Sequence, residues 1–195
     1  KWMSRQTKQY QTQMNEQQKR LDELLFLQTM KGQCEMNDAF LNICLEKGLL
    51  DPEEHAVLAL FAVKIDTVNG RVNAQELVQN YEYLDGQKQA FEMALQQIAH
   101  YLVNDGNVLF GFLSFRETDE DTVFDILDRV RKEMGGQEEP TVSVLVSTRF
   151  RRIDYITSAY NEILELQHDM DWTGEYDVRK DYAAFQSEEQ KRGTG

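Results

Sequence analysis

The stretch AFEMALQQIAHYLVNDGNVLFGF, residues 90–112, holds the clearest structural pattern in this sequence. Its first part places apolar residues three or four positions apart, which predicts an amphipathic helix over 87–103. The positions that match this template are Phe91, Ala94, Leu95, Ile98, Ala99 and Leu102. An Asn-Asp-Gly turn signal follows. The apolar run 107–115 then predicts a buried strand, because it has no polar face.

The chain on the amino-terminal side of this stretch predicts further helices. Residues 2–31 are rich in Gln, Lys and Glu and predict one long helix, and residues 35–48 predict a second that ends at a glycine. A third helix is expected over 53–65, because Asp51 is a favourable N-cap and Pro52 suits the first helical position. Its body is almost wholly apolar, so we expect it to be buried.

The chain on the carboxyl-terminal side predicts a helix over 118–135, an alternating strand over 141–150 and a helix over 153–170. The helix over 118–135 lies between the strands expected over 107–115 and 141–150, and these three elements could form a βαβ unit with parallel strands. The sequence does not decide whether those two strands pair directly. From residue 171 onward the chain is polar with scattered aromatic residues, which predicts an irregular tail.

The passage NGRVNAQELVQNY, residues 69–81, combines a turn, a short extended pair and a capped amphipathic segment. It looks like the passage from the first strand to the second helix of the winged helix-turn-helix superfamily. Residues 90–112 look like the third helix of that superfamily running into the wing. Residues 53–115 as a whole therefore resemble a winged-helix domain. The resemblance implies DNA binding or, as in acidic members of the superfamily, a platform for docking proteins.

These patterns predict a mostly helical α+β protein. We expect an N-terminal helical arm over 1–48 and a winged-helix-like centre over 49–116. A helix-strand-helix extension is expected over 117–170. Its first helix and its strand form a small strand-helix-strand unit with the strand expected over 107–115. An irregular, flexible C-terminal tail is expected over 171–195.

The charge of the chain disfavours some classes of partner. The net charge is −13, and such an acidic protein repels phosphate backbones and anionic lipid. Nucleic acid is thus disfavoured as a partner, and no membrane binding is expected. Residues 1–31 alone sum to +3, so the remainder of the chain sums to −16. A basic arm on an acidic body suits an acidic partner, or is a solvated helix face.

The cysteines and the apolar runs bear on location. Cys34 and Cys44 form neither a CxxC motif nor a zinc-ligand pair, which favours an intracellular, cytoplasmic setting. No apolar run approaches the roughly 18–20 residues that span a bilayer. The chain starts at Lys1, which leaves room for a removed N-terminal segment that held a targeting signal.

No motif for catalysis or for metal binding is evident. An EF-hand with Gly70 at its sixth position would place Ile65 at the first, where a carboxylate is needed. Four acidic residues after the strand at 107–115 could hold Mg²⁺ for phosphoryl chemistry, although an acidic first helical turn is the simpler interpretation. These residues are Glu117, Asp119, Glu120 and Asp121. We therefore expect no catalytic residue, no metal and no cofactor. A cation-dependent enzyme or a degenerate EF-hand protein is the third choice of function.

The first helix suggests a function in assembly. Met3, Tyr10, Gln17 and Leu24 share one heptad position, and Thr7, Met14, Leu21 and Gln28 share the other. This seam is interrupted by polar residues, and such a helix is not stable alone. The sequence thus favours a non-enzymatic protein–protein interaction or scaffold subunit of a larger assembly. Its expected partners are other protein subunits, with self-association through the N-terminal helix included. The predicted partner-binding residues are Tyr10, Leu21, Leu24 and Leu25, with Trp172 and Tyr176 as a second contact.

The alternative function is that of a winged-helix DNA-binding regulator. Its predicted nucleic-acid-binding residues are Lys88, Gln89, Gln96, His100 and Arg116. Gln side chains can read adenine edges, but Lys88 next to Glu92 gives little attraction for phosphate. His100 is expected on the exposed face of its helix. A separate basic group, Arg149, Arg151 and Arg152, could bind an acidic partner or pair with local carboxylates.

Overall fold

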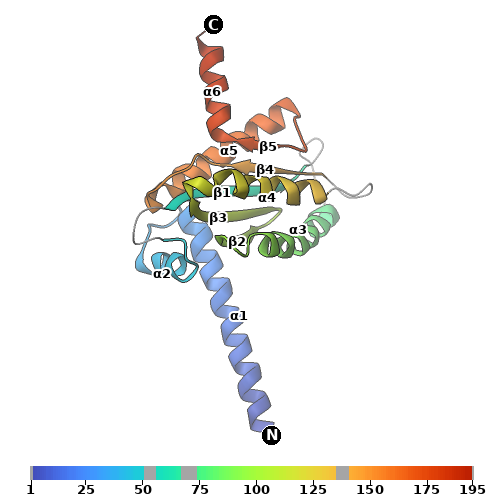
Figure 1. Cartoon of the computed structure of the whole chain (residues 1–195). Helices are drawn as coiled ribbons and strands as arrows, with labels where there is room; N and C mark the ends of the chain where they lie inside the picture. The colour runs from blue at the N-terminus through green and yellow to red at the C-terminus, as the bar shows by residue number, and fades with distance from the viewer. Residues whose placement is uncertain (1, 51–55, 67–73, 135–140, 195) are drawn as a thin grey trace.

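A five-stranded sheet lies between two layers of helices in this computed structural model, which describes residues 2–50, 56–66, 74–134 and 141–194 (Figure 1). The helices are α1 (Trp2–Met30), α2 (Asp38–Glu46), α3 (Ala74–Ala94), α4 (Glu120–Glu133), α5 (Ile156–Thr173) and α6 (Tyr182–Gly193). The strands are β1 (Ala56–Ile65), β2 (Ala99–Asp105), β3 (Val108–Arg116), β4 (Val142–Val146) and β5 (Arg179–Asp181). The protein is thus a mostly helical α+β protein, as expected.

The strands lie in the order β2-β3-β1-β4-β5. The central strand β1 is antiparallel to both β3 and β4, and β5 joins the edge parallel to β4. The two strands that flank α4 therefore run parallel to each other but do not pair, because β1 lies between them. The run from β1 to β4 is the split βαβ arrangement.

The prediction of a helix over 53–65 is wrong for the described part of that segment, because Ala56–Ile65 is the central strand. Helices cover both faces of the sheet, so β1 has no solvent face and its sequence does not alternate. A continuous apolar run of this kind cannot be told from a buried helix by periodicity. The expected N-cap at Asp51 lies outside the described residues.

The helix expected over 87–103 is divided by the structure. The helix α3 runs through the Asp85-Gly86 pair, a dipeptide typical of turns, and ends at Ala94. Ala99–Asp105 then forms β2. Asp105 and Val108 pair across a tight hairpin, so the Asn-Asp-Gly signal marks a strand-to-strand turn. Parts of two helices behind the winged-helix resemblance, residues 56–65 and 99–103, are strands here. The amphipathic segment expected within residues 69–81 is helical from Ala74 onward, and the strand expected over 107–115 is β3.

The sheet separates two apolar cores. One lies under α1, α2 and α5, where Phe26 of α1 contacts the rings of Phe40 at 5.5 Å and Tyr101 at 4.9 Å. The other lies under α3 and α4 and includes Phe61 and Phe91. Since α1 belongs to the first core only through its last turns, the rest of that helix is left outside.

The C-terminal region is more regular than the irregular tail expected from residue 171. The helix α5 continues to Thr173, and Asp181 caps α6 by accepting a hydrogen bond from the amide of Ala183 at 3.0 Å. Tyr182 and Phe185 pack against the first core. These aromatic side chains, which the sequence left without a core to fill, hold α6 against the body.

Candidate interaction surfaces

The helix α1 projects from the body, with the N-terminus at its far end (Figure 1). Every residue from Met3 to Leu21 is exposed, and burial begins only in the last turns of the helix. Helices in water gain most of their stability from packing an apolar face. Over residues 3–21 the described body of the chain therefore provides no packing surface for α1.

The apolar residues of the projecting part lie along one side. Met3, Tyr10, Met14, Leu21 and Leu24 are the large apolar side chains of α1 that are exposed, with exposed fractions from 47 to 78 %. All five occupy the two heptad positions defined above, together with Thr7, Gln17 and Gln28. We call these eight residues the α1 seam. The structure places three of the predicted contacts, Tyr10, Leu21 and Leu24, within it.

The side of α1 that enters the body is a different one. Phe26, Thr29 and Met30 are buried, and they lie on the side of the helix away from the seam. Leu25 is half-buried and packs against the first core, so it lies at the boundary between the two sides. The same helix can thus remain docked while its seam receives a partner.

The residues that flank the seam are almost uncharged. One flanking position follows the Met3 position of the seam and holds Ser4, Gln11, Gln18 and Leu25. The other precedes the Thr7 position and holds Gln6, Gln13, Arg20 and Leu27. The cations Arg5, Lys8 and Lys19 lie outside these flanking positions. Two identical helices could therefore lie along each other without opposing like charges.

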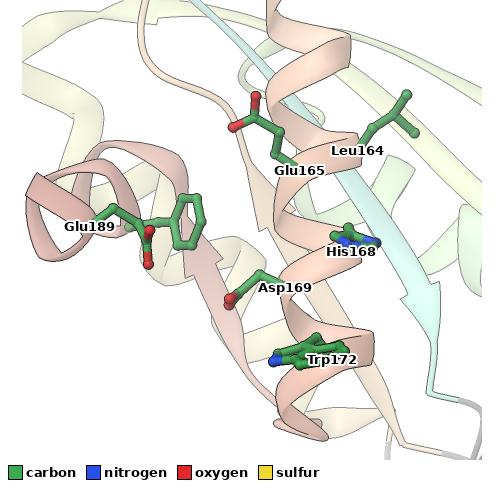
Figure 2. Close-up of a pocket in the computed structure, with 7 residues that line it drawn as sticks. Leu164, Glu165, His168, Asp169, Trp172 and Glu189 are labelled. Atoms are coloured by element: carbon green, nitrogen blue, oxygen red, sulfur yellow. The ribbon is translucent and has the colours of Figure 1, made fainter. Parts of the chain in front are cut away.

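A second surface lies between α5 and α6. Its groove has a volume of ≈ 670 Å³ and is lined by Leu164, Glu165, His168, Asp169, Trp172, Phe185 and Glu189 (Figure 2). Leu164, His168 and Trp172 follow at four-residue spacing on α5, so they form one stripe. Trp172 is 85 % exposed. We call this surface the α5–α6 groove.

The polar contacts of the α5–α6 groove leave it acidic. Tyr182 donates a hydrogen bond to Glu165 at 2.7 Å, and this bond together with burial raises the pKa of the Tyr182 phenol to about 12. Asp169 pairs with Lys180 at 2.5 Å. Burial lowers the pKa of Lys180, but hydrogen bonds to Asp169 and Glu175 outweigh it, so the net shift is upward. The lining itself holds three carboxylates and neither Lys nor Arg.

Tyr176, the other predicted contact of the C-terminal region, does not line this groove. Its side chain is half-buried and packs against the first core. Trp172 and Tyr176 are thus separated by the turn that follows α5, where Gly174 adopts a φ of 67°.

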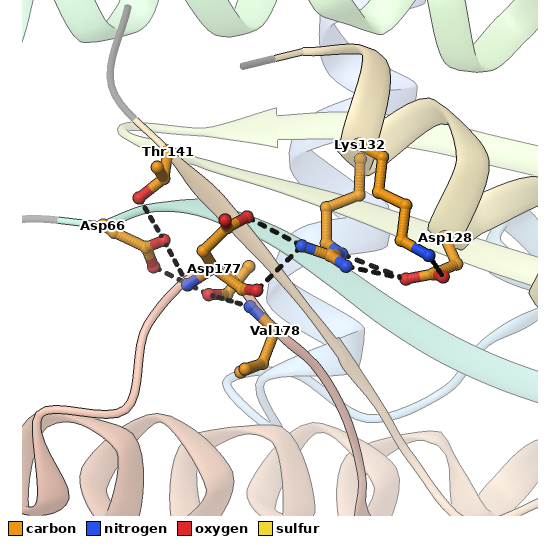
Figure 3. A network of polar contacts seen from close by, with 8 residues as sticks. Asp66, Asp128, Lys132, Thr141, Asp177 and Val178 are labelled. Carbon is orange, nitrogen blue, oxygen red and sulfur yellow. Dashed lines mark hydrogen bonds and ion pairs between the residues drawn. The ribbon is translucent and has the colours of Figure 1, made fainter.

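A polar network holds the segment between α5 and β5. Asp66, at the end of β1, accepts hydrogen bonds from Thr141 Oγ1, Ser143 Oγ and the amide of Asp177, each at 2.8 Å (Figure 3). Arg131 of α4 donates to the carboxylate of Asp177 at 2.7 Å and to its carbonyl at 2.8 Å. Asp177 has a φ of 56°, which is unusual for a residue other than glycine. The network thus determines where β5 and α6 begin.

The residues predicted for DNA binding are distributed over two places. Lys88, Gln89 and His100 line one cavity beside α1. Lys88 lies 3.7 Å from Glu23, and His100 lies 2.5 Å from Glu92. The prediction of an exposed His100 is wrong, because only 13 % of its side chain is exposed. Both basic groups are thus accompanied by carboxylates.

The remaining two residues of that set lie elsewhere. Gln96 is exposed after the end of α3, and Arg116 is exposed at the end of β3. Neither lines the cavity that holds Lys88. The structure therefore does not gather the five residues into one surface.

The acidic residues that follow β3 pair with the arginines that follow β4. Glu120 accepts a hydrogen bond from Arg149, and Glu117 lies 3.0 Å from Arg151. Arg152 pairs with Asp154 at 2.7 Å. The interpretation of these arginines as partners of local carboxylates is thus confirmed.

No group of three or more His, Cys, Asp or Glu in the part of the chain that the structure describes is arranged to hold a metal ion. Ile65, the first position of the EF-hand alignment, is buried in β1, and the loop that follows residue 66 lies outside the described residues. None of the described helices is both long and apolar enough to cross a membrane.

Sequence reasoning identified Trp172 but not the groove around it. The stripe of Leu164, His168 and Trp172 was a possible signal, since helical spacing places these residues on one side. Its second wall, α6, carries only Phe185 and Glu189, in a segment without a clear apolar pattern. Comparison of the chain with protein-family models and with curated proteins finds no match. The two surfaces are therefore the basis for assigning a function.

Proposed function

We propose that this protein is a non-enzymatic protein–protein interaction subunit that associates with a second copy of itself through the α1 seam. The observation that carries the proposal is that the exposed large apolar residues of α1 coincide with heptad positions, on the side away from the docked one. This pattern is typical of a coiled coil. Coiled-coil pairing would bury these side chains without moving the body.

The second copy is favoured over an unrelated partner by charge. In a parallel pair, Gln6 would face Gln11 of the other copy, and Gln13 would face Gln18. A strongly acidic or basic partner helix would gain no opposite charge at these positions. Gln17 within the seam would weaken the pair while favouring one register. We therefore expect a dimer that dissociates on dilution.

The test is sedimentation equilibrium of the full chain over a range of concentrations. Wild type is expected to shift from monomer to dimer as its concentration rises. The variant Leu21→Glu/Leu24→Glu should stay monomeric, because four added carboxylates would meet in the dimer. A matched control is Gln9→Glu/Thr12→Glu, which places the same charges at the same spacing outside the seam.

Each outcome has a defined meaning. Association that is lost in the seam variant and kept in the matched control supports the proposal. A wild-type monomer at every concentration, or equal loss in both variants, would overturn it. If the chain binds random-sequence duplex DNA at low salt and added salt releases it, the alternative function, a DNA-binding regulator, replaces the proposed one.

A further inference from the structure

We infer that the α5–α6 groove binds a basic segment of another protein, with an apolar residue seated against Trp172 and Lys or Arg side chains beside the carboxylates. This interaction goes beyond self-association and uses none of the residues of the α1 seam. The two surfaces lie at opposite sides of the body, since α1 and α6 project in opposite directions (Figure 1). Each can thus be tested without the other.

The apolar side chains of the groove come from both of its helices. Leu164 and Trp172 belong to α5, and Phe185 belongs to α6. No cation lies over the ring of Trp172 among the described residues, whereas Phe124 is covered by Arg149 at 4.2 Å. The face of an exposed tryptophan is the best site in proteins for a cation–π contact.

The charge of the groove determines the kind of partner. Glu165 is bonded only to the neutral Tyr182 phenol, and Glu189 lies 3.5 Å from Arg192 on its own helix. Asp169 shares Lys180 with Glu175. The lining therefore keeps an excess of negative charge, which attracts Lys and Arg and repels acidic segments.

A second copy of this chain does not suit the groove. Residues 32–195 sum to −16, because the whole chain carries −13 and residues 1–31 sum to +3. The body of another copy would thus be repelled. Its basic segments are α1, whose apolar side is the seam, and the group Arg149, Arg151 and Arg152, which pairs with local carboxylates. A different protein with a basic, apolar segment is the occupant that fits the observed charges.

The measurement is a fluorescence titration of the full-length Trp2→Phe variant, in which Trp172 is the only tryptophan. The probes are two synthetic helical peptides with the same leucines, one with lysines beside them and one with glutamates. The lysine peptide should shift the Trp172 emission and saturate, and the glutamate peptide should not. Replacement of Glu165 and Glu189 by Gln should weaken the binding of the lysine peptide about tenfold or more.

A matched control separates the groove from general attraction. The variant Glu82→Gln/Glu133→Gln removes the same charge from exposed positions on α3 and α4 and should leave the affinity unchanged. Equal weakening in both variants, or no binding of the lysine peptide, would overturn the inference. So would a loss of self-association on Trp172→Ala, because the groove would then hold a second copy. The Leu21→Glu/Leu24→Glu variant should bind the peptide normally, so a failure of the α1 proposal is distinguishable.

Discussion

Leu24 and Phe26 are two residues apart on α1 and point in nearly opposite directions. Phe26 is completely buried between α2 and the sheet, while 51 % of Leu24 is exposed. A helix turns about 100° per residue, so two positions correspond to about 200°. Neighbouring apolar residues of one helix thus belong to different interactions.

Replacing each of these residues by alanine should separate the two interactions. Phe26→Ala is expected to lower the free energy of unfolding by about 3–5 kcal/mol, because it leaves a cavity in the first core. Leu24→Ala should change the unfolding of the monomer by about 0.5 kcal/mol or less but weaken self-association. Urea unfolding at low protein concentration measures the first effect, and sedimentation equilibrium the second. Equal loss of stability in the two variants would contradict this description of α1.

Gly111 of β3 provides a test of the sheet. It pairs with Phe61 of β1, and a Cβ at position 111 would lie 2.1 Å from the ring of Phe61. Because that ring is enclosed in the second core, Gly111→Ala should destabilise the protein by about 1–3 kcal/mol. The double variant Gly111→Ala/Phe61→Leu should lose less than the sum of its single changes, as measured in a double-mutant cycle. Additive losses would contradict the proposed contact.

Asp66→Asn tests the network that positions β5. The carboxylate accepts three hydrogen bonds, whereas the amide nitrogen of asparagine cannot accept any. We expect a loss of about 1–3 kcal/mol in the free energy of unfolding, and faster amide exchange over residues 177–181. Hydrogen exchange with mass spectrometry measures the local effect. Exchange that accelerates equally throughout the chain would show that Asp66 supports the whole fold instead.

Cys44 predicts a dependence of stability on alkaline pH. Burial raises the pKa of its thiol from 9.0 to about 12. In the unfolded chain the thiol ionises above about pH 9, while in the folded protein it stays protonated until about pH 12. The contribution of Cys44 to the free energy of unfolding is therefore complete below about pH 9 and is lost between about pH 9 and pH 12. The stability advantage of wild type over Cys44→Ala should therefore narrow by about 1.4 kcal/mol per pH unit above pH 9.

The two cysteines allow a control for this effect. Cys34 is half-buried and close to the hydroxyl of Thr29, at 3.3 Å. A thiol-specific reagent at neutral pH should label Cys34 first and Cys44 only when the protein opens. Equal rates of labelling would mean that Cys44 is not enclosed, and the pH effect should then be absent as well.

The sequence predicted the long first helix and the second helix from their composition, spacing and terminal glycine, and the strand β3 from an apolar run that follows a turn signal. It did not predict β1, because a strand covered on both faces has no alternation for a pattern to reveal. The apolar residues of 90–102 fit helical spacing, yet Leu102 lies in a strand. The pairing of Tyr101 with Phe112 and of Leu102 with Gly111 across the hairpin determines that result, and helical spacing takes no account of such pairing.

The two candidate surfaces also differ in whether the sequence alone could predict them. The α1 seam could be predicted from the sequence, because it follows the spacing of residues within one helix. The α5–α6 groove could not, because it depends on where the network of Asp66 and Arg131 directs α6. Trp172 alone indicated an exposed aromatic residue. Its neighbours across the groove became evident only in three dimensions.

The central position of β1 has a consequence for the synthesis of this protein. Phe61 pairs with Gly111 and Ala62 pairs with Leu145, so the neighbours of β1 are made about 50 and 83 residues later. At about 5–20 residues per second, the ribosome completes them only several seconds after β1. During that interval a ten-residue apolar segment has no neighbouring strand. The growing chain is therefore more exposed to aggregation, and to capture by chaperones, than the finished protein.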